Sequence, residues 1–314
     1  MSTAFVFPGQ GSQTVGMGKA LADAYPASRA VFEEVDEALG QKLSDIIWTG
    51  PEATLQLTAN AQPALMAVSI AALRALESEG VRLADVASYV AGHSLGEYSA
   101  LAAAGAIGVA DTARLLRIRG DAMQAAVPVG EGAMAALLGL DYEAAVAVAA
   151  EAAGDEVCAA ANDNQPGQVV VSGHKAAVER AMEIAKGRGA KRALLLPVSA
   201  PFHCSLMQPA ADRMAEALAA VTVSAPVVPV VSNVLAAPIS DPDEIRRRLV
   251  EQVTGTVRWR ESVEWLSSAG VDRYVEIGAG KVLSGLVKRI AKDALTLNAG
   301  APDDIAAVKA ALGL

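Results

Sequence analysis

Short apolar runs alternate with longer segments of helical periodicity along the chain, and this pattern predicts an α/β fold. Residues 3–7 are apolar and β-prone, and they stop at the glycine-rich turn 8–12, so a strand and a loop are expected there. Apolar positions then recur at helical spacing over 16–39 and again over 62–79, where Gly80 ends the pattern. The start of the chain therefore predicts a strand, a loop and two long helices.

The order of the predicted elements changes near Gly130. From there the chain reads strand, helix, strand, strand, helix, strand, over 133–140, 142–153, 157–161, 168–172, 175–188 and 192–198. This βαββαβ order is that of the ferredoxin-like arrangement, which is a compact unit in its own right. We therefore expect a small inserted ferredoxin-like domain over 129–199 and a discontinuous large domain over 1–128 and 200–314.

The large domain is expected to be hydrolase-like, with a mostly parallel sheet flanked by helices. Its second part contains the predicted strands 227–232 and 273–277 and predicted helices around 206–220, 243–253 and 259–269. The composition agrees, because 53% of the 314 residues are hydrophobic but only 4% are aromatic. That balance favours helices packed closely on a sheet over an aromatic-rich β-sandwich.

Composition and charge exclude several classes of function. The net charge is −9, so no nucleic-acid partner is expected, because binding a phosphate backbone draws on clustered lysine and arginine. Cys158 and Cys204 have neither Cys-x-x-Cys spacing nor clustered histidines, so no metal site is expected. No apolar segment approaches the ~18 residues of a membrane span, and the N-terminus does not resemble a signal peptide. We expect a cytoplasmic protein without a membrane partner.

A Gly-x-Ser-x-Gly segment at 92–96 lies between a predicted strand over 88–91 and a predicted helix over 97–104. In this setting the glycines relieve crowding at a tight turn, and the serine oxygen stands above the sheet. Ser94 is therefore the candidate nucleophile, and the N–H of Leu95 at the start of the helix would stabilise a developing oxyanion. The alternative is that Ser94 only caps a strand-to-helix turn.

A serine nucleophile needs a base, and the chain contains three histidines. His93 adjoins Ser94, where successive side chains diverge, and His174 follows a strand of the small domain and fits a surface turn. His203 lies just past the domain boundary, in a segment that can return to the cleft, so we expect it to be the base. The alternative is a buried histidine bonded to the backbone. No acidic residue lies near His203 in sequence, so a backbone carbonyl would complete a Ser-His dyad.

Four motifs occur along the chain in a fixed order. They are Phe-Pro-Gly-Gln-Gly-Ser-Gln at 7–13, Gly-His-Ser-Leu-Gly-Glu-Tyr at 92–98, Pro-Phe-His at 201–203 and Glu-Ile-Gly-Ala-Gly-Lys at 276–281. Together they resemble the malonyl-CoA:acyl carrier protein transacylases, over nearly the whole chain. Acyltransferase domains of polyketide and fatty acid synthases share these motifs within much larger polypeptides. The family also has a small ferredoxin-like domain, in agreement with the predicted insertion.

The resemblance implies a role for each matching position. Ser94 carries the acyl group as an ester, and His203 moves the proton. Arg119 matches the arginine that holds the malonyl carboxylate, to which a guanidinium gives two charge-assisted hydrogen bonds that an acetyl group cannot accept. The residues alone do not separate Arg119 from Arg114 and Arg117, so this choice comes from the resemblance.

The resemblance also assigns three backbone groups. The N–H groups of Gln10 and Leu95 would form the oxyanion hole, and the alternative for Gln10 is a purely structural turn. The carbonyl of Gln252 would orient the histidine, which supplies the third group that the sequence near His203 lacks.

These roles imply a two-step, ping-pong acyltransferase. It would move malonyl from malonyl-CoA to the phosphopantetheine thiol of acyl carrier protein through a malonyl-serine ester, for fatty acid or polyketide synthesis. No metal or redox cofactor is implied, since coenzyme A and phosphopantetheine enter as parts of the substrates, and a monomer is expected.

One alternative function is that of a hydrolase of another Gly-x-Ser-x-Gly family, although His203 precedes more than a hundred residues and no His-Gly-Gly loop is present. The other is a non-catalytic scaffold for the carrier.

Overall fold

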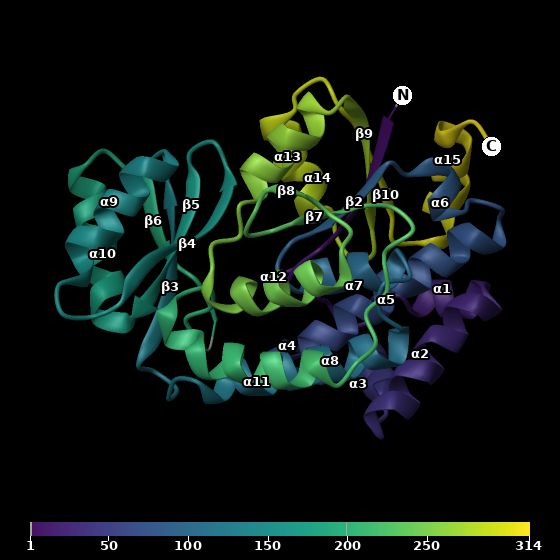
Figure 1. Ribbon diagram of the computed structural model, residues 1–314, viewed down its shortest axis with the longest axis horizontal. Coiled ribbons are helices and arrows are strands. Elements are labelled where there is room, and N and C mark those ends of the chain that lie inside the picture. The colour runs from purple at the N-terminus through teal and green to yellow at the C-terminus, as the bar shows by residue number, and fades with distance from the viewer. Residues whose placement is uncertain (1, 199) are drawn as a thin grey trace.

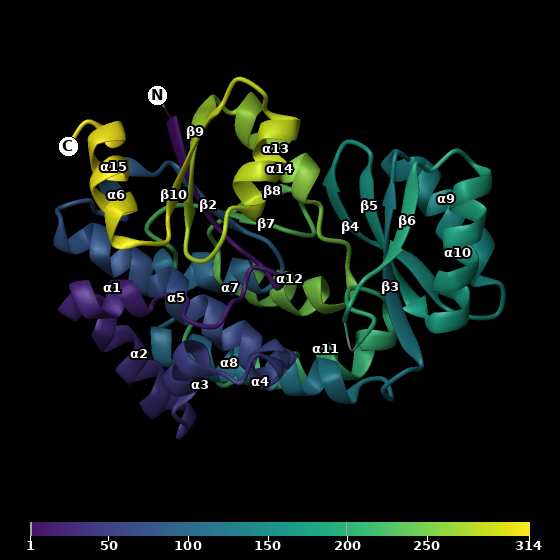
Figure 2. The same ribbon diagram turned by 180° about the vertical axis from the view of Figure 1, so that it is seen from behind.

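The computed structural model describes residues 2–198 and 200–314, and these residues form two sheets with helices around them (Figure 1, Figure 2). The larger sheet has six strands, in the spatial order β10 (Leu295–Ala299), β9 (Val271–Ile277), β1 (Ser2–Phe7), β2 (Tyr89–Gly92), β7 (Val230–Ser232) and β8 (Ala237–Ile239). Every neighbouring pair is parallel except β7 and β8. This sheet confirms the predicted α/β class and the mostly parallel arrangement.

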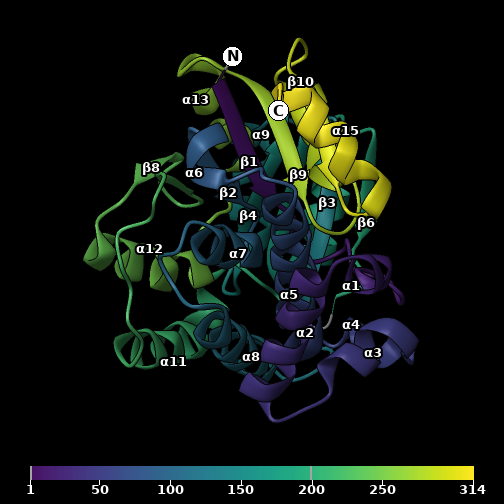
Figure 3. The same ribbon diagram turned by 90° about the vertical axis from the view of Figure 1, so that its right-hand side faces the viewer.

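Helices cover both faces of the larger sheet. On one face lie α2 (Pro26–Leu39), α5 (Thr58–Ser78), α7 (Leu95–Ala103) and α8 (Val109–Ala125), and on the other lie α13 (Trp259–Ser268) and α14 (Val282–Ile290). Side chains alternate along β1, so Phe5 and Phe7 join the first layer while Ala4 and Val6 join the second. Figure 3 shows α5 between the strands and the outer helices α2 and α8, which explains why α5 is apolar on nearly all sides.

The remaining helices of this larger unit are α1 (Lys19–Ala24), α3 (Leu43–Thr49), α4 (Glu52–Gln56), α6 (Leu83–Val86), α11 (Gln208–Ala219), α12 (Pro242–Thr254) and α15 (Pro302–Leu312), with a short 3₁₀ turn at Ser205–Met207. The single helix predicted over 16–39 is wrong, because Tyr25 is extended and Pro26 begins a second helix there. None of the described helices combines the length and the hydrophobicity that crossing a lipid bilayer requires.

The smaller sheet has four antiparallel strands, in the order β4 (Cys158–Gln165), β5 (Gln168–His174), β3 (Gly132–Leu138) and β6 (Arg192–Leu195). The helices α9 (Tyr142–Ala153) and α10 (Lys175–Gly187) complete the predicted βαββαβ order and share a separate apolar core with this sheet. The ferredoxin-like arrangement is thus confirmed. The boundaries 1–128, 129–199 and 200–314 stay a prediction, and residue 199 lies outside the described residues.

The smaller unit is fixed to the larger one along β4. The backbone of Val257 donates to Ala161 and accepts from Asp163, with both N···O distances at 2.9 Å. The buried Asp163 carboxylate also pairs with Arg260 of α13 at 2.8 Å. These contacts hold the two units on either side of a shared cavity.

Candidate active site

Ser94 occupies a sharp turn between β2 and α7, with φ 54° and ψ −111°. Two glycines make this turn sterically possible. A Cβ on Gly92 would lie 1.9 Å from the carbonyl carbon and oxygen of Gly96, and one on Gly96 would lie 2.2 Å from the carbonyl oxygen of Phe7. The predicted strand, turn and helix are therefore found, and the serine stands at the cavity, as in a nucleophile elbow.

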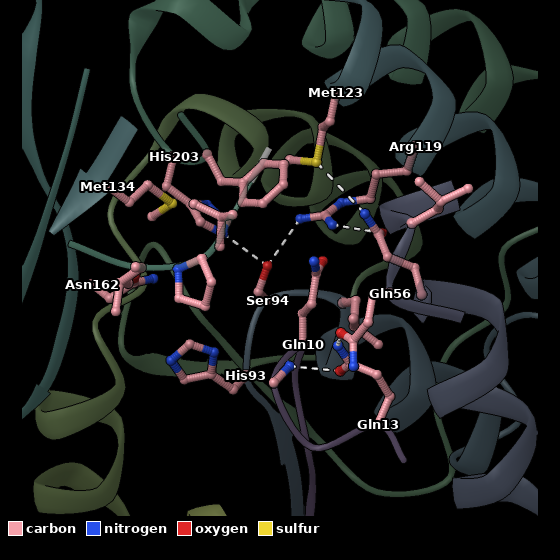
Figure 4. Close-up of a pocket in the computed structure, with 18 of the residues that line it drawn as sticks. Gln10, Gln13, Gln56, His93, Ser94, Arg119, Met123, Met134, Asn162 and His203 are labelled. Atoms are coloured by element: carbon pink, nitrogen blue, oxygen red, sulfur yellow. Dashed lines mark hydrogen bonds between the residues drawn. The ribbon is translucent and has the colours of Figure 1, made fainter. Parts of the chain in front are cut away.

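His203 is within proton-transfer reach of the serine. Its Nε2 lies 2.8 Å from Ser94 Oγ (Figure 4). Its Nδ1 lies 2.8 Å from the backbone carbonyl oxygen of Gln252. A carbonyl can only accept, so Nδ1 carries the proton and Nε2 is free to accept from the serine hydroxyl. Burial, and next the charge of Arg119, lower the pKa of His203 from 6.5 to about 3, so the imidazole is neutral.

Arg119 lies on α8 and is only 1% exposed, with its guanidinium directed at the nucleophile (Figure 4). Its Nη1 donates to Gln62 Oε1 at 2.7 Å, and its Nη2 donates to Gln252 Oε1 at 2.8 Å and to Ser94 Oγ at 3.1 Å. Its Nε has no hydrogen-bond partner within residues 2–198 and 200–314. Burial lowers the pKa of Arg119, while the nearby Tyr98 and Glu97 oppose that shift.

The two other arginines of α8 lie away from the nucleophile. Arg114 is exposed and pairs with Asp111 at 2.8 Å. Arg117 donates to Asn60 at 2.7 Å and to Gln41 at 2.9 Å. Neither lines the cavity, so the structure separates these arginines where the sequence could not.

The cavity has a volume of about 800 Å³ and is walled by both units. Gln10 and Leu95 line it beside the serine. Leu95 is the first residue of α7, so its N–H has no carbonyl of a preceding helical turn to bond. The loop that contains Gln10 packs tightly on the elbow, since a Cβ on Gly9 would lie 2.7 Å from the His93 carbonyl oxygen.

The other two histidines have separate partners. His93 Nε2 lies 2.8 Å from Asn164 Oδ1, and the ring packs near Trp259. His174 Nδ1 accepts from the N–H of Val157 within the smaller unit. Among the residues that the structure describes, no group of His, Cys, Asp or Glu is arranged to hold a metal ion.

Comparisons with known proteins place this geometry in a family. The model of the acyl transferase domain matches residues 4–303. The malonyl CoA-acyl carrier protein transacylase of Escherichia coli (strain K12) is 49% identical, with 99% of each chain covered. The acyl-carrier-protein-S-malonyltransferase of Bartonella henselae is 57% identical, with full coverage of both chains and a TM-score of 0.98. The chain belongs to the malonyl-CoA:acyl carrier protein transacylase family. It is therefore an acyltransferase.

A further solved structure is that of a malonyl-transacylase in complex with a type II PKS acyl-carrier protein. It is 43% identical to this family member, covers 98% of each chain and has a TM-score of 0.94. An acyl carrier protein is thus a partner of a close structural relative.

Sequence reasoning missed three polar residues of this transacylase-family site. Gln62 accepts a hydrogen bond from Arg119. Asn233 and Glu97 lie beside the turn of Ser94 and are 2% and 1% exposed. Burial raises the pKa of Glu97 to about 7, although its hydrogen bonds with Gln252 and Asn233 oppose that shift. Glu97 belongs to the motif around Ser94, which was a signal for it, whereas Gln62 and Asn233 belong to none of the four motifs.

Proposed function

We propose that this chain transfers malonyl from malonyl-CoA to the phosphopantetheine thiol of acyl carrier protein through an ester on Ser94. The observation that carries the proposal is the continuous contact from Gln252 through His203 to Ser94, with the buried Arg119 guanidinium beside the same hydroxyl. This arrangement supplies a nucleophile, a neutral base and a fixed positive charge for an acyl group that ends in a carboxylate.

In the first step His203 Nε2 takes the hydroxyl proton as Ser94 Oγ attacks the thioester carbonyl. The oxyanion forms beside the N–H groups of Leu95 and Gln10, which stabilise it without reorganisation. The carbonyl of Gln252 steadies the imidazolium through Nδ1. The tetrahedral intermediate then expels the coenzyme A sulfur, to which His203 returns the proton, and a malonyl-serine ester remains.

In the second step the phosphopantetheine thiol of the carrier attacks that ester, and the same groups act again. His203 accepts the thiol proton and returns it to Ser94 Oγ when the serine leaves. The carboxylate of the acyl group would replace Ser94 Oγ as a partner of Arg119, because the guanidinium and the ester share one cavity. The complex of a related transacylase with a PKS acyl-carrier protein supports such a carrier as the acceptor.

The proposal includes the other expectations from the sequence. The chain's own residues supply every proton transfer and charge contact of this mechanism, so no cofactor is assigned a step. The cavity of about 800 Å³, which is walled by both units, has room for an acyl group and the phosphopantetheine arm that carries it. We further propose that the enzyme is a cytoplasmic monomer.

The test is mass spectrometry of the intact protein after exposure to malonyl-CoA without a carrier. A covalent malonyl adduct is expected, and peptide mapping should place it on Ser94. The adduct should disappear when phosphopantetheinylated acyl carrier protein is added, and the carrier should gain the same mass. Repeated turnover of malonyl-CoA in the absence of a carrier would instead identify a hydrolase.

The pH dependence of Ser94 acylation should reflect the buried base. Since the pKa of His203 is lowered to about 3, the base stays neutral as the pH falls, and acylation should not drop near the ordinary histidine pKa of 6.5. The rate of Ser94 acylation should instead change near pH 7, where Glu97 titrates. Rapid-quench measurements on Glu97→Gln should not show that change. A step near pH 6.5 that survives this substitution would contradict a buried neutral imidazole.

A further inference from the structure

The side chain of Asn233 bridges the backbone on both sides of His93. Asn233 directly follows β7 and is 2% exposed. Its Oδ1 accepts from the N–H of Ser94 at 2.7 Å, and its Nδ2 donates to the carbonyl oxygen of Gly92 at 2.6 Å. One amide thus satisfies a backbone donor and a backbone acceptor of the turn, and this pairing fixes which way the amide points.

The turn needs such support. Ser94 has a positive φ of 54° together with ψ −111°, a conformation that disfavours any residue with a Cβ. A backbone of this kind persists only where the surrounding structure holds it. The N–H groups of Gly96 and Glu97 bond the carbonyls of His93 and Ser94 within the turn, and Asn233 reaches the Ser94 N–H and the Gly92 carbonyl from outside it.

The buried carboxylate of Glu97 holds the backbone of Asn233. Glu97 Oε2 accepts from the backbone N–H of Asn233 at 3.1 Å and from Gln252 Nε2 at 2.8 Å. Gln252 Nε2 also donates to the carbonyl oxygen of Ser94 at 2.9 Å, and the backbone carbonyl of Gln252 orients His203. The network therefore joins the backbone of the nucleophile to the residue that aims the base.

We infer that Asn233 is a positioning residue for acyl transfer. Its amide holds the strained turn so that Ser94 Oγ lies in line with His203 Nε2, and Glu97 keeps the Asn233 backbone in place. The inference rests on the proposed function, because it requires Ser94 to be the nucleophile. Asn233 itself touches neither the hydroxyl nor the imidazole, so it acts through the geometry of Ser94.

The first test is Asn233→Ala. We expect the rate of Ser94 acylation by malonyl-CoA to fall about 100-fold, since a displacement of about 1 Å at a reacting atom has that effect. The KM for malonyl-CoA should change little, because Arg119 and the cavity walls remain. Modification of Ser94 by phenylmethylsulfonyl fluoride, which needs no malonyl group, should slow by a similar factor. Asn298→Ala, on β10 at the opposite edge of the sheet, is the control and should match the wild type in both assays.

The second test is Asn233→Asp, which separates positioning from simple destabilisation. A protonated aspartic acid retains an oxygen that accepts from Ser94 N–H and an O–H that donates to Gly92, whereas the carboxylate loses that donor. Activity relative to the wild type should therefore rise as the pH is lowered from about 8 to about 5.5, because burial raises the pKa of an aspartate. The Asn233→Ala variant should show no such recovery.

Two charged residues bond the Asn233 backbone directly, and two further titratable groups are linked to Asn233 through Gln252. They are Glu97 on α7, Arg119 on α8, His203, and Arg258, whose backbone N–H bonds the Asn233 carbonyl at 3.0 Å. The wild type and Asn233→Ala contain all four, so a pH-dependent recovery seen only in Asn233→Asp belongs to the carboxyl group introduced at position 233 and to its coupling with Glu97.

Two results overturn the inference. One is that Asn233→Ala reacts with both reagents at close to the wild-type rate. The other is that Asn233→Asp shows the same flat ratio against pH as Asn233→Ala. Failure of the wild type itself to acquire a malonyl group would remove the proposed function instead, and the sulfonyl fluoride rates would still decide the role of Asn233.

Discussion

Ser94→Ala is expected to form no malonyl-enzyme and to lower malonyl transfer to the carrier by about 10⁴-fold or more, as for other serine nucleophiles. The substitution removes the atom that becomes acylated, and no other hydroxyl is bonded to His203 in the described part of the chain. The cavity and Arg119 remain, so malonyl-CoA should still bind. Intact-mass spectrometry and the rate of coenzyme A release in the presence of carrier measure the effect, and calorimetry measures the binding.

Ser99→Ala is the matched control for this loss. Ser99 lies on the same helix α7, is fully buried, and its hydroxyl has no hydrogen-bond partner within residues 2–198 and 200–314. Its removal should therefore leave transfer close to the wild-type rate. If Ser94→Ala transferred malonyl as fast as Ser99→Ala, the acyl-enzyme mechanism would be wrong.

The parts of the fold that could be predicted from the sequence are those with strong local signals. The βαββαβ unit was found because its strands and helices are short, regular and separated by turns. The helix α8 received no prediction, although it carries Arg119. Its sequence contains Gly120, which is there because a Cβ would lie 2.5 Å from the Cα of Ala59 in α5. That reason is a tertiary contact, and no local pattern reports it.

The edge of the larger sheet was missed for a different reason. The strand β10 is mostly half-buried and includes polar residues, so it lacks the apolar run that marked β1. The helices α14 and α15 follow β9 and β10 and were also unassigned. Both helices are short, with nine and eleven residues, so their apolar positions repeat over few turns.

The residues of the candidate site also divide into those with a local sequence signal and those that only the fold brings together. The turn at Ser94 was readable because its glycines are required by the backbone itself. His203 was found by elimination, but its partner Gln252 is 49 positions away and could come only from the family resemblance. The side chain of Gln252, which contacts Arg119 and Glu97, was not anticipated. Spatial partners of this kind depend on how the whole chain folds.

Arg119→Ala is expected to change which acyl group the enzyme prefers. The value of kcat/KM for malonyl-CoA should fall by about 10²–10³-fold, since removing one member of a buried, hydrogen-bonded charge pair costs about 3–4 kcal/mol. Acetyl-CoA has no carboxylate for Arg119 to bind, so its kcat/KM should change far less. The ratio of the two values therefore moves towards acetyl, and it can be measured from coenzyme A release with each substrate.

The ratio also separates carboxylate recognition from damage to the site. Arg119→Ala leaves the amide oxygens of Gln62 and Gln252 without their donor, and this loss should slow both substrates alike. Arg117→Ala, on the same helix but outside the cavity, should leave the ratio unchanged. Arg119→Lys keeps the charge but not the planar fork, so its ratio should lie between those of the wild type and Arg119→Ala. An Arg119→Ala enzyme that was slower but still preferred malonyl as strongly as the wild type would show that another group holds the carboxylate.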